Sequence, residues 1–209
     1  MIDLELEKKL FLNNIKIINF RNVLLSLGYV LAMLFMINKD NLLEEWIVVI
    51  VEEFMSIIGI ILFAKIAIVD FESKMNEFTY TKVYPYWRIV LTRIIIVSIE
   101  LLAIISAGLC ILKTLGGEFE FLKILFGGFV TSFYLGVIAI FFAYVAKRIE
   151  IGYLVPFLYY FLEIFSKGKY TRNLYLFGMV TGDYVSKVKL FMISIILTIF
   201  CMVIIKKES

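Results

Sequence analysis

Long apolar stretches, separated by short charged ones, recur six times along the chain. A bilayer core of about 30 Å requires roughly 20 helical residues at about 1.5 Å of rise each. The stretches of suitable length are residues 23–37, 46–69, 89–112, 121–146, 149–165 and 188–205. The first of these is short unless the preceding turn, residues 17–21, extends it. The pattern predicts an all-α integral membrane protein with six transmembrane helices in a single domain, residues 1–209.

The composition supports a membrane protein and excludes several other classes. Hydrophobic residues make up 62% of the 209 residues and charged residues only 19%, whereas soluble domains are about 45–50% apolar and about 25% charged. The net charge of +3 is small and scattered, so we expect no nucleic-acid partner. The chain has no histidine and no GxxxxGK[ST] loop. We therefore expect no catalytic residue, no metal site and no cofactor bound by this chain.

The distribution of basic residues predicts the orientation. With the N-terminus inside, 12 of the 21 Lys and Arg residues fall on the cytoplasmic side and 8 outside, and Lys65 falls within the second span. This bias places the chain in the cytoplasmic membrane with both termini inside. Residues 166–187, predicted as an extracellular loop, are basic and oppose the bias. If they were cytoplasmic, the chain would have five or seven spans.

The residues before the first span, 1–22, predict an amphipathic helix on the cytoplasmic leaflet. Leu4, Phe11, Ile15 and Ile18 recur at helical spacing among charged residues. The alternative is a charged extension of the first span.

The predicted cytoplasmic loop between spans two and three, residues 70–88, has a distinctive order. An acidic start suits the first turn of a short helix, and Pro85 then ends that helix or begins the third span. Trp87 is expected at the membrane interface, and Arg88 marks the inner end of the span. A short helix joined by a proline to a span can transmit force from a soluble partner. The alternative is an ordinary charged loop.

This loop resembles that of the ABC-2 family of ABC exporter permeases. The matching features are Glu72, Glu77, the stretch Phe78-Thr79-Tyr80-Thr81, Pro85, Arg88 and Arg93, within a layout of an interfacial helix, six spans and cytoplasmic termini. The chain departs from the family at Asn76-Glu77-Phe78, where Gly-Thr-Leu is common. In the family the short helix binds a partner ATPase. The residues expected to couple to it here are Glu72, Lys74, Glu77, Tyr80, Lys82, Pro85 and Arg88.

The resemblance also implies the partners and the function. A separate ABC ATPase would bind ATP and Mg²⁺, and a second permease chain, identical or related, would complete a dimer in the lipid bilayer. The expected activity is export of a hydrophobic or amphiphilic cargo, including a peptide toxin in self-protection. The alternative is a membrane binding or immunity protein that uses no energy, or the substrate-capture subunit of a transporter.

Three carboxylates within the spans are candidates for a translocation path, because an ionised residue at mid-bilayer costs about 2.5–3.5 kcal/mol. Glu52 and Glu53 lie near the outer end of their span, where they could reach the interface or a water-filled mouth. Glu100 lies near the midplane, either as a buried protonated acid or as a path residue. Arg93 is expected to extend its long side chain to the interface. Glu163, at the outer end of its span, carries no expected role.

Small residues and tyrosines mark the fourth and fifth spans. Gly128, Ser132 and Gly136 form a row that allows close helix approach, expected within the bundle rather than at a dimer face. Five tyrosines could pack the core or line a path for an amphiphile: Tyr134, Tyr144, Tyr153, Tyr159 and Tyr160.

Overall fold

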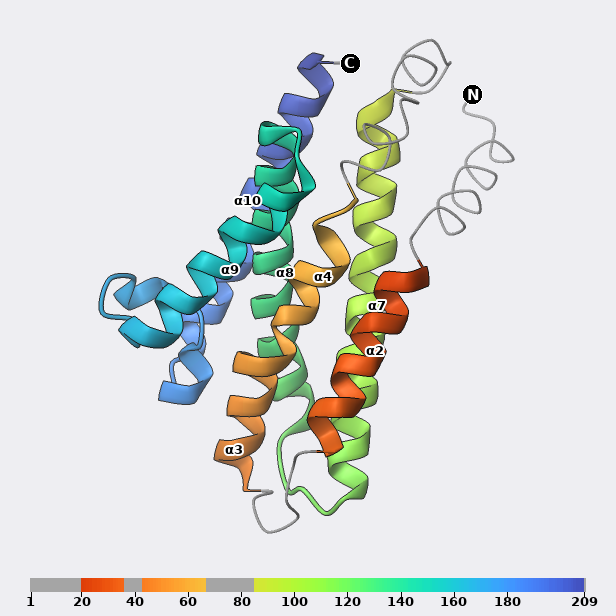
Figure 1. Cartoon of the computed structure of the whole chain (residues 1–209). Coiled ribbons are helices and arrows are strands. Elements are labelled where there is room, and N and C mark those ends of the chain that lie inside the picture. Colours follow the sequence, from red (N-terminus) through yellow and green to blue (C-terminus); the bar gives the residue numbers. More distant parts are fainter. Residues whose placement is uncertain (1–19, 36–42, 67–84, 209) are drawn as a thin grey trace, which may run out of the picture.

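The computed structural model describes residues 20–35, 43–66 and 85–208, and these residues form helices joined by short connections (Figure 1). The first described helix is α2 (Phe20–Phe35), followed by α3 (Glu44–Val49), the π-helix η2 (Ile50–Met55) and α4 (Ile57–Phe63). The long helices α7 (Tyr86–Thr114), α8 (Phe121–Ala146) and α9 (Ile149–Ser166) come next. Two short 3-10 helices, η3 (Arg172–Leu174) and η4 (Gly178–Thr181), precede α10 (Tyr184–Glu208).

Five helices of the described chain are long and apolar enough to cross a membrane. They are the continuous run Glu44–Phe63, which joins α3, η2 and α4, together with α7, α8, α9 and α10. Helix α2 is apolar but shorter. The predicted all-helical architecture is therefore confirmed for the described residues. The five apolar helices suggest a multi-pass membrane protein, and six spans remain a prediction. The predicted interfacial helix, residues 1–22, lies almost entirely outside the described residues, as does most of the loop 70–88.

The predicted span boundaries agree most closely with the structure at α8 and α9. Residues 121–146 match α8 at both ends, and residues 149–165 match α9 to within one residue. Helix α10 begins at Tyr184, four residues before the predicted start of the last span. The prediction started after Lys187 because a lysine is rarely placed within a span.

Helix α8 lies at the centre of the bundle, in contact with α4, α7, α9 and α10. Figure 1 shows α7 and α8 running in opposite directions, with α9 tilted away from them towards the connection that leads into α10. In α8, 72% of the apolar stretch is buried, against only 22% in α9 and in α10. An exposed apolar helix face is expected in a membrane protein, because lipid replaces water around it.

The row of small residues on α8 packs against the run that contains η2 and α4. A Cβ atom added at Gly59 would lie 1.8 Å from the backbone oxygen of Ser132, and one at Gly128 would lie 2.3 Å from Val51. Gly136 is in similarly close contact with the ring of Phe63. The prediction that this row serves packing within the bundle is confirmed. The close approach fixes the position of η2 relative to α8.

Residues 167–183, which we call the α9–α10 connection, fold back against the bundle. Lys167 (φ 49°) ends α9 in the left-handed conformation, and Gly182 (φ 77°) allows the turn before α10. The Asp183 carboxylate then caps α10 by accepting the backbone N–H groups of Val185 (3.0 Å) and Ser186 (3.2 Å). The apolar side chains of Leu176 and Phe177 are fully buried, so this connection belongs to the core.

Candidate functional site

The site begins at the π-helix η2, which interrupts the run between α3 and α4. A π-helical turn is wider than an α-helical turn and often occurs at functional sites. Two of its backbone oxygens accept hydrogen bonds from other helices: the Tyr160 hydroxyl donates to Glu53 O (2.6 Å) and the Tyr29 hydroxyl to Phe54 O (3.2 Å). The widened turn is therefore held from α9 on one side and α2 on the other. It directs the side chain of Glu52 into the bundle, where it is completely buried.

Glu52 forms a buried ion pair with Lys187 of α10. We call these two residues, together with Thr131, the charge cluster. Lys187 is only 1% exposed. Its ammonium group donates to a Glu52 carboxylate oxygen, to the Thr131 hydroxyl (2.7 Å) and to Leu176 O. An ammonium group has three N–H donors, and here each has an acceptor. The second Glu52 oxygen accepts the backbone N–H groups of Met179 (2.9 Å) and Val180 (3.3 Å).

The charge cluster thereby holds the α9–α10 connection in place. Lys187 binds its backbone at Leu176, and Glu52 binds it at the η4 residues Met179 and Val180. Hydrogen bonds to charged groups are roughly twice as strong as those between neutral groups, and more so where water is excluded. Movement of Glu52 or Lys187 would therefore release this connection.

A second buried carboxylate, Glu163 of α9, holds the same connection from the other side. One of its oxygens accepts the Thr171 hydroxyl (3.0 Å) and the backbone N–H of Leu176 (3.2 Å). Glu163 is fully buried, although its position predicted no role. Tyr175, in the same connection, is 8% exposed, and burial followed by the nearby carboxylates raises its pKa to about 12. Its hydroxyl is therefore neutral at physiological pH.

The three predicted path residues do not come together. Glu52 is neither at an open mouth nor extended to the interface, because it pairs with Lys187 inside the bundle. Its neighbour Glu53 is half-buried and does not join this ion pair. The positive charge that acts on the Glu53 carboxylate is that of Lys167. Glu100, on α7, is also half-buried, and one of its carboxylate oxygens is buried without a hydrogen-bond partner.

Of the predicted coupling residues, only Pro85 and Arg88 fall within the described residues, and the others lie outside them: Glu72, Lys74, Glu77, Tyr80 and Lys82. Pro85 is exposed and immediately precedes α7, and the Arg88 guanidinium lies 5.4 Å from the centre of the Trp87 ring.

Arg93 differs from its prediction. Its side chain is 3% exposed and donates to Ile66 O (3.3 Å), so it is buried rather than extended to the interface. It links α7 to the end of the preceding helical run.

Sequence reasoning missed Lys187, Thr131 and Glu163 as members of the site. Lys187 was counted among the basic residues of the extracellular loop, and Thr131 carried no charge to mark it. The available signal was the helical periodicity of residues 184–189, which continues the last span past Lys187. Among the described residues, no three His, Cys, Asp or Glu side chains lie close enough together to hold a metal ion.

Together, the apolar helices suggest a multi-pass membrane protein, and the interior of the bundle holds a buried Glu–Lys pair. The chain matches no known protein family, no curated protein and no solved structure.

Proposed function

We propose that this chain is the permease subunit of an ATP-driven exporter of the ABC-2 type, moved by a separate ATPase. Two permease chains would surround the path in the cytoplasmic membrane, with their termini in the cytoplasm. The cargo would be hydrophobic or amphiphilic, with a peptide toxin as one candidate. The layout of the bundle and the order of residues 70–88 support this proposal.

The observation that carries the proposal is the continuity of the run Glu44–Phe63. One end of this run leads through Ile66 into the segment expected to bind the ATPase. Its middle contains Glu52, which holds the α9–α10 connection. A single helical run thus joins the expected input of force to the site that it would move.

Two contacts support force transmission along this run. Arg93 binds Ile66 O, so the two helices on either side of residues 67–84 are linked in the bundle. Tight packing of Gly59 on the backbone of Ser132 leaves little freedom for lateral displacement. A push on residues 67–84 would therefore act along the run, and η2, the irregular turn within it, is where a change of register is easiest.

In this proposal the charge cluster acts as a gate that controls the position of the α9–α10 connection. With Glu52 and Lys187 paired, the α9–α10 connection stays against the bundle. A shift of η2 would weaken the two hydrogen bonds that the backbone N–H groups of η4 donate to Glu52. The α9–α10 connection could then move outwards. Coupling of this kind requires two arrangements of one element that both sites bias.

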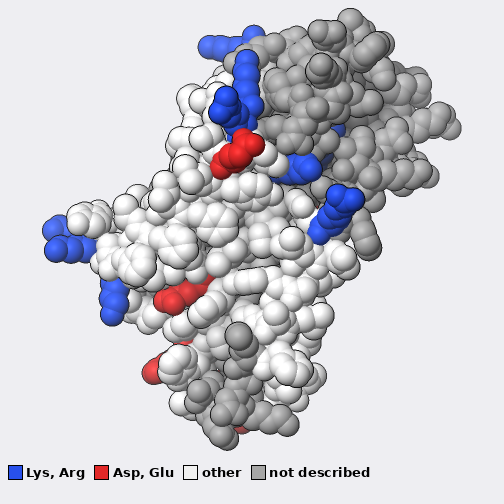
Figure 2. Space-filling model, in the orientation of Figure 1, with Lys and Arg blue, Asp and Glu red and all other residues white. Residues whose placement is uncertain are grey.

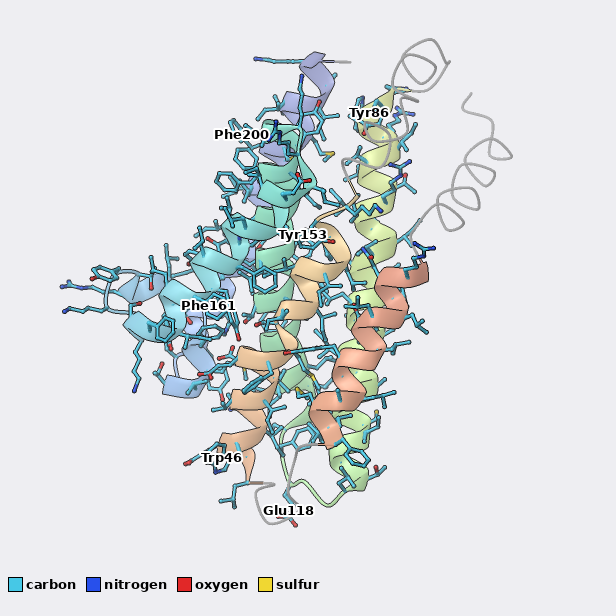
Figure 3. All side chains as sticks on the ribbon, in the orientation of Figure 1. Trp46, Tyr86, Glu118, Tyr153, Phe161 and Phe200 are labelled. Carbon is cyan, nitrogen blue, oxygen red and sulfur yellow. The ribbon has the colours of Figure 1, made fainter. Side chains whose placement is uncertain are left out.

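The test is recovery of an ATPase with the affinity-tagged chain from native membranes. We expect the charge reversals Glu72→Lys, Glu77→Lys and Arg88→Glu to abolish ATPase recovery and export together. The matched control is Glu118→Lys, an exposed charge at the opposite end of the bundle from Tyr86 (Figure 3), which should change neither. Function that persists without any ATPase would instead favour the binding or immunity protein.

Orientation has its own test. A cysteine at Lys169, in the α9–α10 connection, should react with an impermeant thiol reagent applied to intact cells. Reaction only after the cells are opened would place this connection in the cytoplasm and contradict the proposed topology.

A further inference from the structure

A cavity of about 550 Å³ lies at the end of the bundle where α3, α8 and α10 begin. Its walls combine apolar side chains with charged and aromatic ones: Leu43, Glu44, Glu45, Val48, Lys123, Met179, Val180 and Tyr184. Under the proposed topology this end faces the exterior. The cavity is thus an open chamber with a mixed lining, unlike the second groove of the bundle, between α7, α8 and α10, whose lining is almost entirely apolar.

The apolar part of the lining comes from two separate elements. Leu43 and Val48 belong to the start of the α3 run, and Met179 and Val180 belong to η4. The backbone N–H groups of these same η4 residues bind Glu52 (2.9 Å and 3.3 Å). A ligand in the cavity would therefore press on residues that the charge cluster holds from the other side.

The charges of the lining favour a cation. Glu44 and Glu45 are exposed and enter no ion pair among the described residues. The positive charge of Lys123 is already compensated, because its ammonium lies 3.6 Å from the Glu120 carboxylate and 4.1 Å from the centre of the Tyr184 ring. The lining therefore offers two carboxylates that form no ion pair with the described residues, and an aromatic ring that already binds a cation on one face.

The surface near the cavity carries several acidic side chains. Figure 2 shows basic side chains near the end that bears the C-terminal lysines and at the left of the view, with acidic ones both among the upper basic ones and lower down. The described carboxylates near the cavity end include Glu44, Glu45, Glu118 and Glu120. Such a field raises the local concentration of cations and lowers that of anions.

We propose that this cavity binds an organic cation with an apolar body, and that this is the cargo class released at the outer end of the path. The inference rests on the proposed export function for its biological meaning, but binding itself requires no ATPase. The apolar walls would take the body of the ligand, while Glu44, Glu45 and the Tyr184 ring would take its charge.

The test uses two ions of nearly the same shape and opposite charge, tetraphenylphosphonium and tetraphenylborate. Each is measured by equilibrium dialysis against the purified chain in phosphatidylcholine nanodiscs, which carry no net charge. We expect saturable binding of the cation, with an affinity that falls as salt is added. Binding of the anion should be at least tenfold weaker. Equal binding of both ions would overturn the proposal, because it would leave only non-selective apolar partition.

Two variants should move the affinity in opposite directions. Glu44→Gln with Glu45→Gln should weaken cation binding by roughly tenfold or more, because two carboxylates near the ligand are lost. Lys123→Gln should strengthen it a few fold, because it frees the Tyr184 ring and removes a like charge. The control pair Glu118→Gln with Glu150→Gln removes two exposed carboxylates away from the cavity lining and should have little effect.

The outcomes separate this proposal from the proposed function. If the control pair weakens binding as much as the Glu44 and Glu45 variants do, the cavity is not the site, whatever the ATPase does. If the cation binds as expected but no ATPase is recovered with the chain, the site stands and the export function fails.

Discussion

Glu52 and Glu100 are both carboxylates within apolar helices, and the bundle treats them differently. Glu52 is fully buried and accepts bonds from Lys187, Met179 and Val180. Glu100 remains half-buried, with one oxygen that lacks a partner. The first residue sits in a π-helical turn that faces the short 3-10 helix η4, whereas the second sits in the unbroken helix α7.

The difference indicates where the charges in this protein have a role. A charge is stable inside a bundle when its surroundings supply partners, and the α9–α10 connection supplies them through the backbone N–H groups of Met179 and Val180. No such groups are available along α7, where the backbone bonds to itself. Glu52 therefore holds the α9–α10 connection, while Glu100 makes no comparable contact in the described structure.

The largest effect should come from breaking the ion pair. Glu52→Leu leaves the Lys187 charge buried and unpaired, and Lys187→Met does the reverse. We expect each to lower the free energy of unfolding by about 3–5 kcal/mol. The measurement is unfolding of the purified chain by SDS titration in mixed micelles.

The double variant Glu52→Leu with Lys187→Met is the control for that prediction. It removes both charges and should recover much of the lost stability, while losing the hold on η4 and, with it, the proposed gating. Single variants that each cost under about 1 kcal/mol would show that the pair is not buried as described.

The next effect concerns the packing that positions η2. Gly59→Ala would place a Cβ 1.8 Å from the backbone oxygen of Ser132, so α4 and α8 must separate. We expect a loss of about 1–3 kcal/mol in the same titration. Gly28→Ala is the matched control, because a Cβ at Gly28 meets nothing within 4 Å. Equal behaviour of the two variants would argue against the close contact.

A smaller effect is expected where α9 supports the π-helical turn. Tyr160→Phe removes the hydroxyl that donates to Glu53 O at 2.6 Å, and it should cost about 1 kcal/mol. Tyr170→Phe, at an exposed position, should cost nothing measurable. A Tyr160→Phe variant as stable as the Tyr170→Phe control would mean that η2 does not depend on this bond.

Glu100→Gln should have the smallest effect. The amide keeps the shape of the carboxyl group, one of whose oxygens is buried without a hydrogen-bond partner. The free energy of unfolding should therefore stay within about 1 kcal/mol of that of the unmodified chain, or rise. Export should also be unchanged. A large loss of export would give Glu100 a place in the path and remove the contrast with Glu52.

The sequence was sufficient for the helices but not for their polar contacts. Apolar run length predicted α8 at both ends and the small-residue row on it, because these follow from local periodicity. It missed the π-helical turn, since residues 50–55 read as ordinary helix. It also misplaced Lys187, because only the distant Glu52 and Thr131 make its burial possible.

The buried carboxylate Glu163 was missed for a related reason. Its partners, Thr171 and the backbone of Leu176, lie 8 and 13 residues later, in a segment with no regular pattern. Polar contacts of this kind depend on how the α9–α10 connection folds back, and no periodicity encodes that. The coupling residues before Pro85 remain a prediction from resemblance.

The central claim is that ATP use by a partner moves the α9–α10 connection. Leu176 is fully buried there, so Leu176→Cys, with Cys110 and Cys201 replaced by alanine, reports its opening. The measurement is the rate at which a small charged thiol reagent labels this cysteine in intact cells, with and without depletion of ATP. We predict a rate at least several-fold higher in energised cells, lost when Glu72 and Glu77 are reversed in charge. The same rate in both conditions would contradict the claim.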